Sequence, residues 1–257
     1  MVTQPTGGSG RYGFLMTAAI GLAVVLAWNH LGLDTARLGT SGGRLLDFLQ
    51  RMVPPDLSVL GIVTEAAIET VEIALIGTAL SIAASIPLGL LAAGTVTPAW
   101  VHVSVKWLLA AIRGIPLILV AMIMVGAVGL GPLPGVLAIA FHSTGMLAKF
   151  FAEAFESVDT RPLAALSSSG ASAFQIHWFG TLPQIAPDLL RDVMFRFELN
   201  LRESLVLGLV GAGGIGFYIQ TYIRSFQYQK VATLTIVILV MVIAIEAVTY
   251  GLRRVLR

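Results

Sequence analysis

Long apolar runs separated by short polar stretches dominate the hydrophobic pattern of this chain. Apolar runs of about 20 residues or more cover 14–33, 64–93, 106–128, 136–155, 189–210 and 231–250. A helical run of about 20 residues matches the thickness of the hydrocarbon core of a bilayer. The pattern therefore predicts an all-α membrane protein with about six transmembrane helices.

The N-terminal part precedes the predicted core. We expect a disordered tail over 1–13, because its start is rich in Gly, Ser and Thr and has no apolar periodicity. A first transmembrane helix and an amphipathic helix on the periplasmic membrane surface follow over 14–60. A signal peptide is the alternative for the first run, but the run is too long for one and lacks a clear cleavage site. The remaining residues, 61–257, form the predicted transmembrane core.

Composition supports the membrane class and excludes others. Only 12% of the residues are charged and the mean hydropathy is +0.88, whereas soluble domains carry about 25% charged residues. The chain contains no cysteine, which excludes disulfides, a thiol nucleophile and Cys-based metal sites. Its net charge is +2, and no basic patch with interleaved aromatic residues suggests nucleic-acid binding.

One long interruption in the second half, 161–187, is too polar to span a bilayer. It predicts a short helix over Arg161–Ser169, a break at Gly170, a second amphipathic helix over Ala171–Thr181 and a stop at Pro183. Such a unit outside the membrane is suited to dock on a partner, although a plain surface loop is the alternative. The distribution of Lys and Arg in short loops places this segment and both chain termini in the cytoplasm.

The fifth apolar run carries an unusual set of polar residues. Asp192, Arg196, Glu198, Asn200, Arg202 and Glu203 all lie within 189–210. Charges at this depth are costly unless they are paired or face water. Arg196, Asn200 and Glu203 are spaced i, i+4, i+7 and share one helix face, so they are candidates for lining a translocation pathway. Glu198 and Arg202 are spaced i, i+4 with the acid first, which predicts a structural ion pair.

Two alternatives stay open for these residues. All the charges of this run can instead form salt bridges between spans and across a dimer, which would hold the helices in register. His142, in the fourth run, is a further candidate for the pathway, but an interior hydrogen-bonded histidine is the alternative. Arginine suits a phosphonate or phosphate group, because its planar fork binds oxyanions through two hydrogen bonds.

A glycine-rich stretch over 211–216 matches the pattern GxGxxG. A dinucleotide site needs a strand before this pattern and a βαβ unit around it, whereas here it follows a membrane span. We therefore predict a sharp bend with close helix approach. The sequence contains no P-loop motif, so ATP would have to bind elsewhere. The four histidines are scattered without ligand spacing, and we predict no metal site and no catalytic residues.

Several of these segments resemble a known family. Ala165, Gly170, Leu182 and Pro183 match the coupling-helix motif of ATP-binding-cassette (ABC) importer permeases, in which Glu-Ala-Ala precedes a Gly and a later Leu-Pro. Ala164 stands where that pattern has Glu. The segments 112–116, 131–156 and 195–216 resemble the phosphonate-transport permease branch. The resemblance extends from about residue 60 to the C-terminus.

The resemblance implies a type I ABC importer permease fold with a cytoplasmic coupling helix. The residues that it assigns to ATPase contact are Ala164, Ala165, Ser169, Gly170, Ala171, Phe174, Leu182 and Pro183. The chain would be the membrane-spanning permease of an ATP-driven importer for phosphonate or a related phosphorus oxyanion in the plasma (inner) membrane. It would not be an enzyme and would bind no cofactor, since ATP and Mg²⁺ would bind to partner subunits. The implied partners are a second copy of the chain, two ATPase subunits and an extracytoplasmic solute-binding protein.

Three other functions compete with this one. A permease for methionine or an osmoprotectant would share the docking pattern and the glycine-rich bend. An ATP-independent secondary transporter would use the ionisable residues of the fifth run for coupling but would need no docking segment. A membrane-embedded enzyme would need clustered catalytic residues, which the sequence does not offer.

Overall fold

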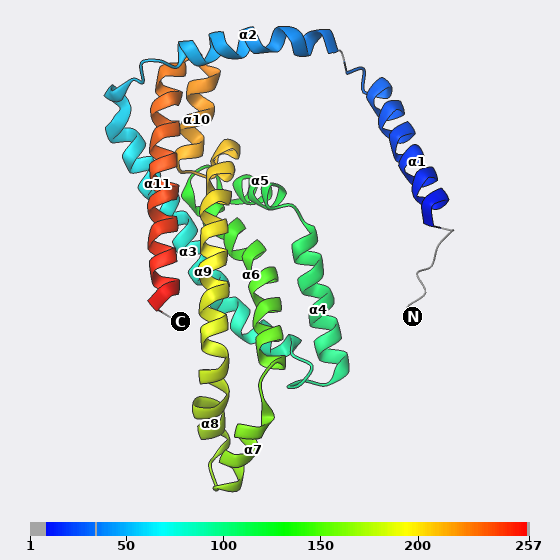
Figure 1. The fold of residues 1–257 in the computed structure, drawn as a ribbon. Coiled ribbons are helices and arrows are strands. Elements are labelled where there is room, and N and C mark those ends of the chain that lie inside the picture. The colour runs from blue at the N-terminus through cyan, green and yellow to red at the C-terminus, as the bar shows by residue number, and fades with distance from the viewer. Residues whose placement is uncertain (1–8, 34, 256–257) are drawn as a thin grey trace. The chain divides into compact units, whose positions relative to one another are not determined.

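The computed structural model describes residues 9–33 and 35–255 (Figure 1). These residues are almost entirely helical and contain no strand. The helices are α1 (Ser9–His30), α2 (Thr35–Arg51), α3 (Leu60–Ala92), α4 (Ala99–Gly114), α5 (Leu117–Val128), α6 (Pro132–Glu156), α7 (Thr160–Ser168), α8 (Ala173–Ile176), α9 (Leu182–Leu207), α10 (Ile215–Arg224) and α11 (Tyr228–Val255), with short 3₁₀ or π turns at Leu57–Val59, His177–Thr181 and Gly208–Val210. The predicted all-α fold is confirmed.

The chain divides into two units, with the boundary after Arg51. The first unit contains α1, which holds the candidate span Tyr12–His30, and the amphipathic α2. Residues 9–13, predicted as part of a disordered tail, are helical, while residues 1–8 of that tail lie outside the described residues. The boundary precedes the predicted one at residue 60, because Val59 packs with Val63 and Leu234 in a core cluster of the second unit.

Helices α3 and α6 form the centre of the second unit. A Cβ atom added at Gly77 of α3 would lie 2.7 Å from a side-chain carbon of Ile139 in α6, and one at Gly89 would lie 2.8 Å from Phe151. Small residues at such positions let two helix backbones approach closely. Helices α3 and α6 are therefore packed too closely at Gly77 and Gly89 to accommodate larger side chains there.

The predicted third span, 106–128, is not one straight helix. Helices α4 and α5 meet at 83° across the break at residues 115 and 116. Pro116 lacks a backbone N–H and disfavours a helical conformation at the residue before it, so the helix ends and starts again in a new direction. Residues 99–105, which precede the predicted third span, also belong to α4.

The region after α9 contains a helix beyond the predicted bend. Residues 215–224 form α10. The bend itself is present: Gly211, Gly213 and Gly214 have positive φ. A Cβ added at Gly216 would lie 2.0 Å from the carbonyl oxygen of Leu205, so the chain returns against the end of α9.

The number of spans agrees with the prediction. In the described part of the chain, four helices are long and apolar enough to cross a membrane, and the count reaches six if each of two bent helix pairs is one span. The bent pairs are α4 with α5, and the segment Phe174–Val210 with α10, which are inclined at 42° to one another.

Candidate functional site

The docking segment, predicted over 161–187, lies at one end of the second unit, where α7 and α8 project beyond α6 and α9 (Figure 1). Asp159 caps the N-terminus of α7 by accepting a hydrogen bond from the Arg161 amide at 2.9 Å. Its carboxylate also pairs with the Arg161 guanidinium at 2.8 Å. These hydrogen bonds hold the pKa of Asp159 below its usual value. The start of α7 is thus fixed by local contacts.

Gly170 ends α7 in the manner predicted for a helix–glycine break. Its φ of +83° lies in the left-handed region. Its amide donates to Ser167 O at 3.0 Å, and the Ala171 amide donates to Leu166 O at 3.2 Å. This pair of hydrogen bonds is a Schellman motif, which satisfies carbonyls at a helix end and favours glycine at the left-handed position. The sharp turn between α7 and α8 therefore depends on Gly170.

The second half of the segment differs from the prediction. The expected helix over Ala171–Thr181 is the short α8 followed by a π turn, and the chain does not stop at Pro183. Pro183 lies at the start of α9, directly after the π turn in which the Leu182 amide donates to His177 O, so the chain stays helical through the proline. The docking segment is therefore continuous with the 26-residue α9.

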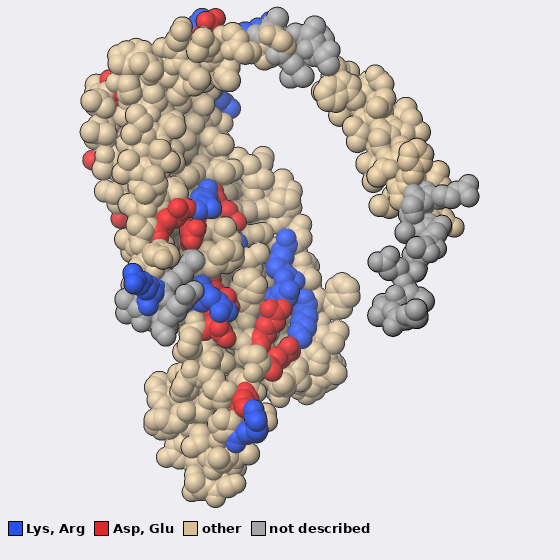
Figure 2. All heavy atoms as spheres, in the orientation of Figure 1, with Lys and Arg blue, Asp and Glu red and all other residues tan. Residues whose placement is uncertain are grey.

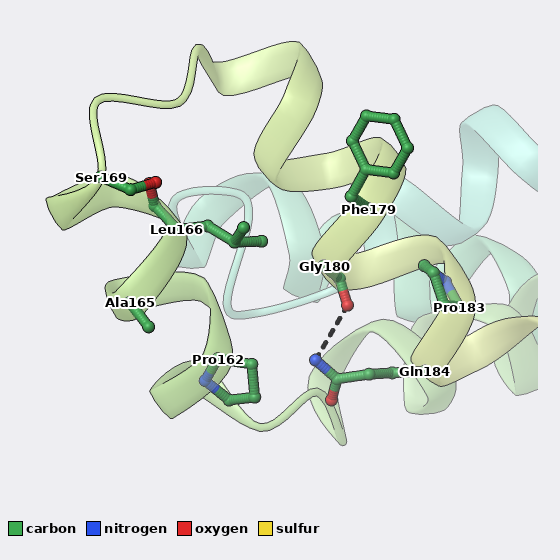
Figure 3. A pocket seen from close by; sticks show the side chains of 8 residues that line it. All are labelled: Pro162, Ala165, Leu166, Ser169, Phe179, Gly180, Pro183 and Gln184. Atoms are coloured by element: carbon green, nitrogen blue, oxygen red, sulfur yellow. Dashed lines mark hydrogen bonds between the residues drawn. The ribbon is translucent and has the colours of Figure 1, made fainter.

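A groove of about 680 Å³ separates α7 from the π turn (Figure 3). It is lined by Pro162, Ala165, Leu166, Ser169, Phe179, Gly180, Pro183 and Gln184. The Gln184 side-chain amide donates to Gly180 O at 2.9 Å, and its oxygen accepts from the Asp159 amide at 3.0 Å. These two hydrogen bonds tie the start of α7 to the start of α9. The sequence pattern does not indicate Gln184, because its role as a link between α7 and α9 depends on these two hydrogen bonds.

Three aromatic rings of the docking segment are uncovered. Phe174 is 72% exposed, Phe179 66% and Trp178 53%, and the rings of Phe174 and Trp178 stack at 5.9 Å. Figure 2 shows mostly uncharged surface at this end of the unit. Exposed apolar surface of this kind marks an interaction site. The predicted ATPase contacts are all exposed or half-buried, as an interface requires.

The polar residues of α9 meet small polar residues of α3 and α6. Arg196 Nε donates to Ser143 Oγ at 3.0 Å, and its Nη2 pairs with Glu203 at 2.7 Å. Ser143 Oγ donates to Asn200 Oδ1 at 2.8 Å, and Asn200 Nδ2 donates to Thr78 Oγ1 at 2.8 Å. Arg196, Ser143, Asn200 and Thr78 are all buried. We call these four residues and Glu203 the α9 network.

Arg196, Asn200 and Glu203 were predicted to share one helix face, whereas their partners Thr78 and Ser143 were not predicted. Single hydroxyl residues are common in apolar spans, so they carry little signal by themselves. His142 is half-buried, and its Nδ1 has no hydrogen-bond partner among the described residues. The pathway role of Arg196, Asn200, Glu203 and His142 stays a prediction.

Glu198 and Arg202 lie outside the network. Arg202 Nη2 lies 3.0 Å from Glu198 Oε1 and also pairs with Glu246 of α11. About half of the Arg202 side chain is exposed. The structural role predicted for this ion pair stays a prediction. In the described ranges, no group of three or more His, Cys, Asp or Glu side chains is placed to hold a metal ion.

Comparisons with known proteins agree with this architecture. The family model described as "Binding-protein-dependent transport system inner membrane component" matches residues 85–257. The putative phosphite transport system permease protein HtxC of Stutzerimonas stutzeri is 39% identical over 90% of this chain and 82% of its own length. The phosphate-import permease protein PhnE of Mycolicibacterium smegmatis is 39% identical over 91% of this chain, which spans 44% of that longer protein.

A solved structure shows the same fold. A chain of the inward-facing MetNI methionine ABC transporter matches 79% of this chain and 99% of its own length, with a TM-score of 0.69 and 18% identity. The family match and the identity to named permeases show that the chain is a membrane-spanning permease subunit of an ABC importer. The chain belongs to the binding-protein-dependent transport system inner membrane component family.

Family membership confirms the resemblance to ABC importer permeases of the phosphonate-transport branch. The chain is a multi-pass inner-membrane transporter subunit and not an enzyme, because partner ATPases hydrolyse ATP in this family. It works in a complex with ATPase and binding-protein partners. An ATP-independent transporter is not favoured.

Proposed function

We propose that this chain is the permease of an importer for a phosphorus oxyanion, namely phosphite, phosphonate or phosphate. The observation that carries the proposal is the 38–39% identity, over nine-tenths of the chain, to permeases named for phosphite and phosphate transport. The structural likeness to a methionine transporter supports the fold alone, because only 18% of the residues are identical.

Docking on the ATPase takes place through the exposed face of the docking segment. The aromatic rings of Phe174 and Phe179 and the turn at Gly170 provide an apolar surface with a fixed shape. Two copies of the permease form the passage, with two ATPase subunits on the cytoplasmic side and a solute-binding protein outside. ATP and Mg²⁺ bind to the ATPase subunits, and both permease termini lie in the cytoplasm.

The test is ATP hydrolysis by the permease reconstituted with its ATPase and binding protein. Phosphite, methylphosphonate, phosphate and methionine are titrated separately, and stimulation by one phosphorus compound is expected. Stimulation by methionine alone would overturn the substrate class.

The docking role is tested by Gly170→Leu in the same assay. A leucine side chain at this position would have open space around it but cannot easily adopt the positive φ, so ligand-stimulated hydrolysis should be lost. Gly61→Leu is the control, because Gly61 lies in α3 with no other atom within 4 Å. Equal activity of the two variants would contradict the docking role.

A further inference from the structure

The two halves of α9 differ in how they are held. In the first half, over 182–195, Ile185 is the buried residue, and Asp188 and Arg191 pair with one another on the surface. From Arg196 onward, Arg196, Asn200, Leu201, Ser204 and Leu207 are all buried. The helix is therefore anchored to its neighbours from Arg196 toward the glycine-rich bend and is largely free on the docking side.

The anchor is a directional chain of hydrogen bonds across three helices. Arg196 of α9 donates to Ser143 of α6, which donates back to Asn200 of α9. Asn200 donates to Thr78 of α3, whose hydroxyl donates to the carbonyl of Ala74 at 2.6 Å. Each hydroxyl thus donates one bond and accepts another. A satisfied buried network of this kind specifies one arrangement of the helices that it joins.

A second connection lies at the far end of α9. Ser204 Oγ contacts the carbonyl of Thr70 in α3 at 3.3 Å, and the amide of Ile215, the first residue of α10, donates to Thr70 Oγ1 at 2.8 Å. Helix α9 runs without a break from the docking segment to this bend (Figure 1), and its 26 residues correspond to about 39 Å. A displacement at the docking end consequently reaches the bend through one helix.

We propose that the α9 network is a clamp that makes α3, α6 and α9 move as one body when the docking segment is displaced, with Arg196 as its central positioning residue. Glu203 neutralises the buried guanidinium and keeps it aimed at Ser143. Arg196 is 1% exposed, so in this conformation a solute does not reach it. This inference rests on the proposed function, since it explains how ATPase movement reaches the far end of the permease.

The first test measures phosphite transported per ATP hydrolysed in proteoliposomes that contain the whole importer. The double variant Arg196→Met with Glu203→Met removes the ion pair without leaving a buried unpaired charge. We expect near-normal ATP hydrolysis with a transport ratio at least fivefold lower. Ser143→Ala, a milder change, should lower the ratio about twofold. Arg202→Gln on another face of α9 is the control and should leave the ratio unchanged.

An unchanged ratio of solute transported to ATP hydrolysed in both network variants would overturn the clamp. A residue that only aids folding would change the amount of active complex but would leave this ratio as it is. Failure of phosphite, methylphosphonate and phosphate alike to stimulate the wild-type importer would overturn the substrate proposal instead. The clamp is then tested by a second measurement that requires no transported solute.

That measurement uses the absence of cysteine from the chain. Single spin labels at Ser168→Cys near the docking turn and at Leu133→Cys, which is exposed in the first turn of α6, report distances between the two copies. Addition of a non-hydrolysable ATP analogue with Mg²⁺ should change both distances in the wild-type background. In the double network variant, the change at 168 should persist and the change at 133 should fall by more than half. Full changes at both sites, or none at either, would overturn the proposal.

Discussion

The docking segment leads directly into α9, the helix that carries Arg196, Asn200 and Glu203 of the α9 network, but the two regions are built in opposite ways. The docking segment exposes Phe174, Trp178 and Phe179 outside the predicted spans, where no described part of this chain covers them. The network buries an arginine and an asparagine inside the bundle and satisfies them with α3 and α6. Thus the apolar surface of the first region is left open within the described chain, whereas the polar groups of the second are already paired within it.

The contrast teaches that polarity alone does not locate function in a membrane protein. Buried charges stand out in the sequence because they are costly in a bilayer. In the folded chain, Arg196 is paired and inaccessible, while the aromatic residues, which are ordinary in this composition, form the open surface. Substitutions in the two regions test this contrast, and their expected effects decrease from the glycine-rich bend to the start of α7.

The largest effect is expected at the glycine-rich bend beside the network. A Cβ at Gly216 would lie 2.0 Å from a backbone oxygen, and backbone cannot move aside cheaply. Gly216→Ala should therefore destabilise the permease by about 4 kcal/mol or more. Thermal unfolding in detergent measures this loss. Gly126→Ala, with no atom within 4 Å, is the control, and a similar stability for both variants would contradict the close packing.

Removal of the network arginine should have the next largest effect. Arg196→Ala breaks a buried ion pair and leaves Glu203 and Ser143 without their partner, at a cost of about 3 kcal/mol. Arg202→Ala removes a half-exposed charge and should cost less than about 1 kcal/mol. Unfolding by a titrated denaturing detergent compares the two. An equal loss of stability in the two variants would contradict a larger contribution from the buried ion pair of Arg196.

The docking segment should respond in the opposite way. Phe174→Ala removes a 72% exposed ring, so the isolated permease should keep its unfolding temperature. Loss of such an interface anchor should weaken ATPase binding by about 2 kcal/mol, or roughly thirtyfold. Trp107→Ala is the matched control, because Trp107 is 74% exposed in α4. Binding of the purified ATPase subunit decides between them, and equal affinity for both variants would contradict the docking surface.

The smallest effect concerns pH at the start of α7. Hydrogen bonding to Arg161 lowers the pKa of Asp159 in the folded chain. The stability that the Asp159 carboxylate contributes is therefore fully present above the usual carboxyl pKa of about 4. It is lost as the pH falls below that value and through the lowered pKa of the folded chain. The measurement is the ratio of the amide hydrogen-exchange rate in α7 of the wild-type chain to that of the Asp159→Asn variant, whose cap carries no charge. This ratio should rise below about pH 4, by less than threefold. A constant ratio across pH would contradict the contribution of this carboxylate.

Several features could be predicted from sequence because they depend on local pattern. The apolar runs predicted the helices, and Gly170 predicted the end of α7, since only a left-handed position there closes the Schellman motif. The sequence does not predict α10, because its short, mixed pattern over 215–224 resembles a polar loop as much as a helix. Proline in a helix interior predicts a stop at Pro183, but the chain stays helical there because the proline directly follows a π turn.

The sequence alone determined that this is a membrane protein, because the length of the apolar runs and the low charge can be read directly from it. The motif of Gly170 and Leu182-Pro183 also carries its resemblance to ABC importer permeases. Tertiary structure decided which polar groups meet. The hydrogen bonds of Ser143 with Arg196 and Asn200 depend on contacts between α6 and α9, which are far apart in sequence. Helical periodicity shows which face a residue occupies, but only packing shows what that face touches.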